Sequence, residues 1–160
     1  MSNWIDQAQS AAAAAKAFAG AAQARVSAAI APNGKVESAA ADREQRLVHG
    51  FAWIATTAEA LAALVGWARQ SRAAGRYSEV EELVLRIGFG EYLGQLLGGV
   101  PMSQNELVRP QELGLVEAAA AMAGAPAVQE FLSGGNTADT RLELARLLHE
   151  GRRPAEALGD

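Results

Sequence analysis

The stretch that decides how this chain folds is residues 86–110, which read RIGFGEYLGQLLGGVPMSQNELVRP. It predicts an apolar helix that runs directly into a polar loop. Five glycines lie in it: Gly88, Gly90, Gly94, Gly98 and Gly99. Each glycine inside a helix costs roughly 0.5–1 kcal/mol relative to alanine. This density therefore needs a compensating interaction, usually the close approach of another backbone or of a ligand.

Three of these glycines lie on one helix face. Gly90, Gly94 and Gly98 form two overlapping Gly-x-x-x-Gly steps, which favour a close crossing against the alanine-rich helix near the N-terminus. Contact with a ligand or with another subunit is the alternative. Gly98 and Gly99 are also typical of a helix end. Residues 103–106 (SQNE) fit a second capping-box pattern, which explains Ser103 and Glu106 as structural residues without a function.

Capping signals and periodicity predict the long helices that precede this stretch. Ser78 and Glu81 form a capping box, so a helix that is apolar nearly all round is expected from there to Gly98. A second helix is expected over residues 38–74, where apolar residues alternate at four-three spacing as in a bundle seam. The seam consists of Leu47, Phe51, Ile54, Ala58, Leu61, Val65 and Ala68. The first helix is expected over residues 3–30, where alanine recurs at spacings of three and four.

Shorter helices are expected after the loop, over residues 110–123, 127–132 and 137–149, and no segment shows strand alternation. The fold class is therefore all-α, a helical bundle of three long helices followed by shorter C-terminal helices. Residues 1–150 are expected to form the bundle domain, and residues 151–160 are expected to form a tail or linker.

Bulk properties exclude several functional classes. The 160 residues fit one domain, and a net charge of −4 without a basic run argues against nucleic acid as a partner. The chain has no cysteine, which suits a cytoplasmic location and excludes a disulfide framework. No positively charged segment precedes the alanine-rich helix, as a signal peptide requires. No run of about 18 uninterrupted apolar residues predicts a membrane span.

No catalytic or metal-binding constellation stands out. The two histidines, His49 and His149, lie far apart and have no paired ligand spacing, so no metal site is expected. The acids near apolar segments are interpreted as solvated or capping groups, and no catalytic residue is predicted. We interpret His49 as a partly buried, locally hydrogen-bonded side chain; a role in proton transfer is the alternative.

Four segments together resemble the helical N-terminal extension of methylsuccinyl-CoA dehydrogenase-like members of the acyl-CoA dehydrogenase superfamily. They are residues 47–56 (LVHGFAWIAT), 87–95 (IGFGEYLGQ), 98–104 (GGVPMSQ) and 108–110 (VRP). The resemblance implies an accessory helical domain that docks on a catalytic core, which binds FAD, and that contributes to a homo-oligomer. It also implies that this chain alone does not catalyse acyl-CoA oxidation. The expected interface residues are Gly90, Glu91, Tyr92, Gly94, Met102, Gln104 and Arg109.

A second, weaker resemblance concerns cofactor binding. Gln95, Gly98 and Gly99 are similar to the Gln-x-x-Gly-Gly motif of acyl-CoA dehydrogenases, which helps hold the adenosine diphosphate part of FAD in a neighbouring subunit. The Gly-Tyr pair that follows the motif there is Pro101-Met102 here, so these residues are only weak candidates and no cofactor is expected in this chain. Two alternatives remain: a stand-alone helical module whose identical chains self-associate, and a domain that binds FAD or CoA by itself.

Overall fold

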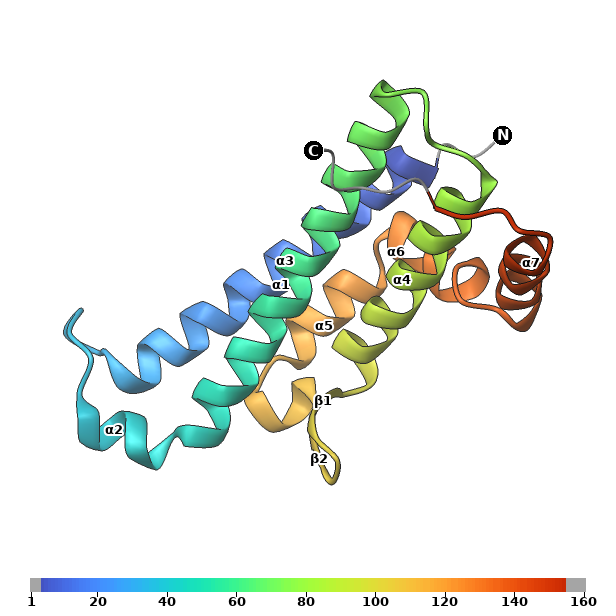
Figure 1. Ribbon diagram of the computed structural model, residues 1–160. Coiled ribbons are helices and arrows are strands. Elements are labelled where there is room, and N and C mark those ends of the chain that lie inside the picture. Colours follow the sequence, from blue (N-terminus) through green and yellow to red (C-terminus); the bar gives the residue numbers. More distant parts are fainter. Residues whose placement is uncertain (1–3, 155–160) are drawn as a thin grey trace.

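The computed structural model describes residues 4–154 and is all-α apart from one short hairpin, which confirms the predicted fold class. Three long helices run alongside one another, with shorter helices packed around them (Figure 1). The helices are α1 (Trp4–Ile30), α2 (Ser38–Arg43), α3 (Gln45–Ala73), α4 (Glu79–Gly98), α5 (Val116–Ala123), α6 (Pro126–Gly134) and α7 (Ala138–His149). The remaining elements are β1 (Val100–Ser103), β2 (Glu106–Val108) and the 3₁₀ turn η1 (Pro110–Leu113).

The predicted helix over residues 38–74 is wrong in one respect, because it is broken at Glu44. Glu44 has φ −100° and ψ 24°, which ends α2 and starts α3 in a new direction. The bend returns α2 to the end of α1, where the Glu37 N–H donates to the Ile30 carbonyl oxygen at 2.9 Å. Ala40 is thereby buried, with 3% of its surface exposed. A straight helix would carry this residue away from the core.

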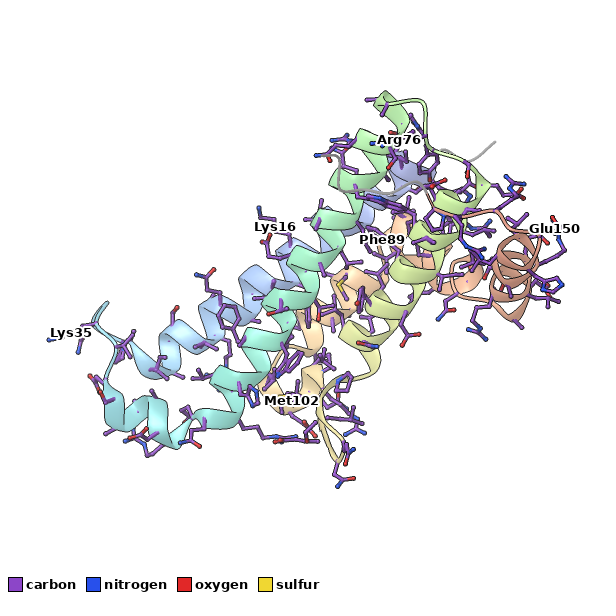
Figure 2. All side chains as sticks on the ribbon, viewed as in Figure 1. Lys16, Lys35, Arg76, Phe89, Met102 and Glu150 are labelled. Carbon is purple, nitrogen blue, oxygen red and sulfur yellow. The ribbon has the colours of Figure 1, made fainter. Side chains whose placement is uncertain are left out.

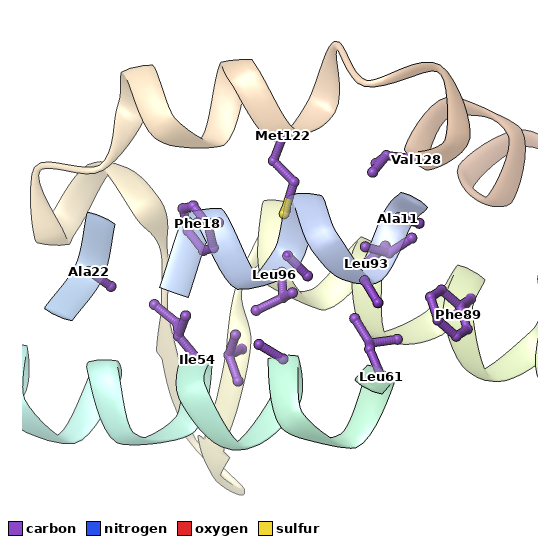
Figure 3. Close-up of a cluster of buried hydrophobic side chains, with 14 of the residues drawn as sticks. Ala11, Phe18, Ala22, Ile54, Leu61, Phe89, Leu93, Leu96, Met122 and Val128 are labelled. Atoms are coloured by element: carbon purple, nitrogen blue, oxygen red, sulfur yellow. The ribbon is translucent and has the colours of Figure 1, made fainter. Parts of the chain in front are cut away.

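The core lies where α1, α3, α4 and α5 meet, and it is filled from both ends of the sequence. Phe18 of α1, Ile54 and Leu61 of α3, Leu96 of α4 and Met122 of α5 are all buried and gather in one cluster (Figure 3). Figure 2 shows that Phe89 and Met102 lie inside the molecule, whereas Lys35 and Glu150 project from it. Buried alanines of α1, among them Ala8, Ala11 and Ala15, belong to this core, and α1 packs mainly against α3.

The predicted capping box at residues 103–106 is wrong, because this segment is the turn of a β-hairpin. Ser103 pairs with Glu106, and Val100 pairs with Val108, in an antiparallel register. Val100, Met102 and Val108 are buried while Pro101 is exposed. This is the alternation of a half-buried strand, but it extends over too few residues to be recognised in the sequence. Burial of these apolar side chains under α3 and α4 decides the structure, and no helix starts at Ser103.

The C-terminal helices follow the predicted positions with one division. The segment 110–123 is split into η1 and α5 because Gly114 takes the left-handed conformation, with φ +71°. Thr137 caps α7 by accepting from the Thr140 N–H at 3.1 Å. Val80, Leu83 and Leu147 form a small second core that holds α7 against α4.

The capping box of α4 is confirmed and supports a first prediction. The Ser78 hydroxyl accepts from the Val80 N–H at 3.2 Å, and the Glu81 carboxylate accepts from the Ser78 N–H at 2.8 Å. We expect Ser78→Ala to lower the free energy of unfolding by about 1 kcal/mol, because a helix-terminal N–H loses its acceptor. Urea denaturation followed by circular dichroism measures this loss. Ser78→Thr keeps the oxygen and should lose less than half as much; equal losses would contradict the capping role.

Candidate functional site

The glycine-rich face of α4 makes one very close contact inside the chain. A Cβ at Gly90 would lie 2.5 Å from the Asn136 backbone nitrogen and 3.1 Å from the Phe131 carbonyl oxygen. A Cβ at Gly135 would lie 2.7 Å from the Arg86 carbonyl oxygen. The close crossing is therefore between α4 and the junction of α6 with α7. The prediction of a close approach is confirmed, but the predicted partner, α1, is wrong.

The other glycines of this helix differ from Gly90. A Cβ added at Gly94 or Gly98 would have open space around it. Apart from nearby backbone of the same helix, no heavy atom of the described residues lies within 4 Å of it. Gly99 ends the helix with φ +139°, a conformation that other residues rarely adopt. Backbone geometry thus explains Gly99 and packing explains Gly90, while nothing among residues 4–154 requires glycine at positions 94 and 98.

Several predicted interface residues serve contacts within the chain. The Glu91 carboxylate accepts from the Asn136 side-chain amide at 2.7 Å and from the Gln95 amide at 2.8 Å. Met102 is 9% exposed and belongs to the core. Gln95, the first weak cofactor candidate, therefore directs its amide at Glu91.

Tyr92 is the predicted interface residue that does line an exposed apolar surface. Tyr92, with 36% of its surface exposed, lies beside a shallow hollow of about 370 Å³. The other residues around this hollow come from α3: Ala60, Ala63, Leu64 and Trp67. Trp53, 38% exposed, lies two helical heptads before Trp67 on the same side of α3. We call these six side chains the outer face.

Most of the outer face belongs to α3, a helix with more apolar residues than the helix buries in the core. Between Arg46 and Arg69 the sequence contains only two ionisable side chains, His49 and Glu59. Among the described helices, α3 alone is long and apolar enough to cross a membrane by length and composition, a test that buried core helices also pass. Only 33% of its most apolar window is buried, although α1 and α4 cover part of it. Apolar surface of this kind is normally covered by a partner.

A polar cluster borders the outer face where α3 begins. Arg46 donates to the Glu106 carboxylate at 3.0 Å, to the Glu112 carboxylate at 2.9 Å and to the Leu107 carbonyl oxygen at 2.8 Å. These bonds hold the hairpin to α3. The hydrogen bond from Arg46 also lowers the pKa of Glu112 below its usual value. Sequence reasoning missed Arg46 because its partners lie about 60 residues away and no local pattern reports them.

Two further predicted interface residues lie beside this cluster. Gln104 is exposed at the tip of the hairpin, and the Arg109 guanidinium lies 3.6 Å from the Glu112 carboxylate.

His49 lies in a neighbouring hollow and its Nε2 accepts from the Trp53 indole N–H at 2.9 Å. The predicted local hydrogen bond of His49 is confirmed, but its side chain is exposed, where partial burial was expected. Among residues 4–154, no three His, Asp or Glu side chains gather as metal ligands would.

Tyr77, in the connection from α3 to α4, supports a pH prediction. Its hydroxyl is buried without a hydrogen-bond partner among the described residues, and burial raises its pKa from 10.0 to about 12. Between these values the unfolded chain loses the Tyr77 proton while the folded chain keeps it. The contribution of the Tyr77 hydroxyl to the free energy of unfolding is therefore fully present below pH 10, and it is lost as the pH rises towards 12.

We expect the urea midpoint to fall over that alkaline range in the wild type and to fall less in Tyr77→Phe. Tyr92→Phe, which removes the other tyrosine, is the control and should retain the full decline. Identical pH profiles for the wild type and Tyr77→Phe would show that this hydroxyl does not titrate differently in the folded state.

The fold and this surface define an all-α helical domain with an apolar face that its own helices leave uncovered. Comparison with known proteins then gives a specific relative. The chain is 39% identical over 123 residues to (2S)-methylsuccinyl-CoA dehydrogenase of Cereibacter sphaeroides. The match covers 76% of this chain and 21% of that enzyme, so the chain spans about a fifth of the length of its relative. No protein-family model matches the chain. The resemblance inferred from the sequence is thus confirmed.

Proposed function

We propose that this chain is an accessory helical domain of a methylsuccinyl-CoA dehydrogenase-like acyl-CoA dehydrogenase, in which it supplies docking or oligomer contacts and not catalysis. The observation that carries this proposal is the coverage of the match: it includes most of this chain and only 21% of the enzyme. A segment of that size in a larger enzyme has the dimensions of one domain, and the chemistry belongs to the remainder.

The contacts of the acidic side chains support a non-catalytic role. Glu81 caps α4, Glu91 bonds Asn136, and Glu106 and Glu112 bind Arg46. Glu81 thus fixes a helix end, and the other three carboxylates hold one part of the fold to another. In the proposed enzyme, FAD and the acyl thioester bind to the catalytic core, and the assembly is a cytoplasmic homo-oligomer.

The proposal also assigns a place to the end of the chain. Residues 1–150 form the domain, and residues 151–160 form the linker towards the core. The first part of this segment returns onto the domain, since the Arg152 guanidinium lies 3.6 Å from the Glu79 carboxylate and the Arg153 guanidinium donates to the Leu148 carbonyl oxygen at 2.6 Å. Residues 155–160 lie outside the described part.

Replacement of the matched segment in the C. sphaeroides enzyme tests the proposed function. Three proteins are compared: the parent enzyme, a variant without the matched segment, and a chimera that carries this chain in its place. We expect the deletion to lower the oligomer mass in sedimentation, the melting temperature or the turnover of (2S)-methylsuccinyl-CoA, and the chimera to restore what was lost. A deletion variant that equals the parent in all three measurements would refute the proposal.

A second candidate function is a stand-alone module that self-associates, and the uncovered outer face favours it. Sedimentation equilibrium of the isolated chain separates the two candidates. A dimer at micromolar concentration supports self-association, whereas a monomer at that concentration removes this alternative.

A further inference from the structure

We propose that the outer face (Trp53, Ala60, Ala63, Leu64 and Trp67 of α3 with Tyr92 of α4) is the surface that packs on the catalytic core of the dehydrogenase. This inference rests on the proposed function and identifies the docking face and the kind of surface it meets. The partner surface is apolar, with a side chain that enters the hollow between α3 and α4.

The shape of the outer face is the first argument. Two small residues, Ala60 and Ala63, line the hollow together with the larger Leu64, Trp67 and Tyr92. Small residues next to half-exposed aromatic rings make a recess that an apolar side chain can fill. Buried aromatic side chains around such recesses contribute most of the binding energy at many protein interfaces.

The charge distribution is the second argument. Glu59, the only carboxylate of α3, lies with Lys16 and Gln23 of α1 around a different hollow. None of the six side chains of the outer face is an acid, a lysine, an arginine or a histidine, and His49 lies beside the face as the acceptor of the Trp53 indole N–H. Helices that lie on a membrane surface carry free Lys and Arg beside the apolar face, but Arg46, at the start of this helix, is bound by Glu106 and Glu112. An apolar protein surface fits this pattern better than a lipid headgroup region.

The covalent link in the relative is the third argument, and it favours the catalytic core over a second copy of the chain. Two free chains need an interface of roughly 1,200–2,000 Å² for stable association. A domain linked covalently to its partner meets it at an effective concentration in the millimolar range, so a smaller apolar face suffices. The relative supplies such a link, since its matched segment is 21% of one longer polypeptide.

Cysteine labelling tests this inference because the chain contains no cysteine. Ala63→Cys places a thiol in the hollow, and Ala62→Cys is the matched control: both alanines are exposed, but they point about 100° apart around the helix. Each variant is prepared in the isolated chain and in the chimera with the C. sphaeroides enzyme. Maleimide labelling rates at the two sites are then measured by peptide mass spectrometry.

In the isolated chain both thiols should react at similar rates. In the chimera we expect labelling of Ala63→Cys to slow by about tenfold or more, since the centre of an interface excludes water and reagents, and labelling of Ala62→Cys to change less than about twofold. An Ala63→Cys chimera that fails to assemble, when the Ala62→Cys chimera assembles normally, also supports the inference.

Other results overturn it. Equal labelling of both sites in an assembled chimera shows that the core does not cover the outer face, while the proposed function stands. Protection of Ala63→Cys in the isolated chain that grows with protein concentration assigns the face to a second copy. Protection only on addition of phosphatidylcholine–phosphatidylglycerol vesicles assigns it to a membrane. A chimera without either substitution that does not assemble contradicts the proposed function itself, and this inference falls with it.

Discussion

Gly90→Ala should lower the free energy of unfolding by about 3 kcal/mol, in the range of overpacked sites where backbone must move. The added Cβ would lie 2.5 Å from the Asn136 nitrogen and 2.9 Å from the Asn136 Cβ. The first of these atoms is backbone, so the junction of α6 with α7 has to shift away from α4. The hydrogen bond from Asn136 to Glu91 would be strained by the same movement. Urea denaturation at neutral pH measures the loss.

Gly94→Ala is the control for this prediction, because it lies one helical turn further along α4. Among the described residues, apart from nearby backbone of the same helix, no atom lies within 4 Å of the new Cβ. We expect this substitution to raise stability by roughly 0.5–1 kcal/mol through helix propensity alone. Similar effects at the two positions would contradict the close crossing at Gly90. Because Gly94 lies outside the outer face, the same variant should leave labelling at Ala63→Cys unchanged.

Phe131→Ala should lower the free energy of unfolding by about 4 kcal/mol, which is typical of a deleted core aromatic side chain. Phe131 is fully buried, and its ring centroid lies 4.8 Å from that of Phe89 and 5.2 Å from that of Trp4. Its removal leaves a cavity between α1, α4 and α6. The loss is measured by urea denaturation, as for Gly90→Ala.

The neighbouring residue provides the comparison for Phe131. Leu132 is 38% exposed, so Leu132→Ala should cost less than about 1 kcal/mol. A small effect of Phe131→Ala would show that α6 is not anchored in the core. A large effect of Leu132→Ala would show instead that α6 is sensitive to any truncation.

Local signals in the sequence were sufficient for most helix boundaries. The capping box at Ser78 and the left-handed glycine after α3, Gly75 with φ +69°, are contacts or conformations within a few residues. The alternating apolar spacing of α3 also placed Leu61 and Ala68 in the core, and both are fully buried. Such features depend on backbone geometry and helical periodicity, which any short segment expresses by itself.

The predictions that proved wrong depended on residues far away in the chain. The SQNE segment has the residue types of a capping box, but burial of Val100 and Met102 makes it a hairpin turn. The contacts of β1 with α3 join segments that are distant in sequence, and local propensity does not report them. The break at Glu44 separates α2, which packs against α1, from α3.

The sequence by itself determined most of the helices, the capping box of α4, the apolar stripe of α3 and the resemblance to a dehydrogenase segment. Only the tertiary structure decided what each glycine of α4 is for. Gly90 meets Asn136, which lies 46 positions further on, and it is small because two backbones cross there. The structure also decided which side of the apolar α3 stays uncovered. Periodicity reports how much apolar surface a helix has, whereas packing of the other helices decides how much of it remains for a partner.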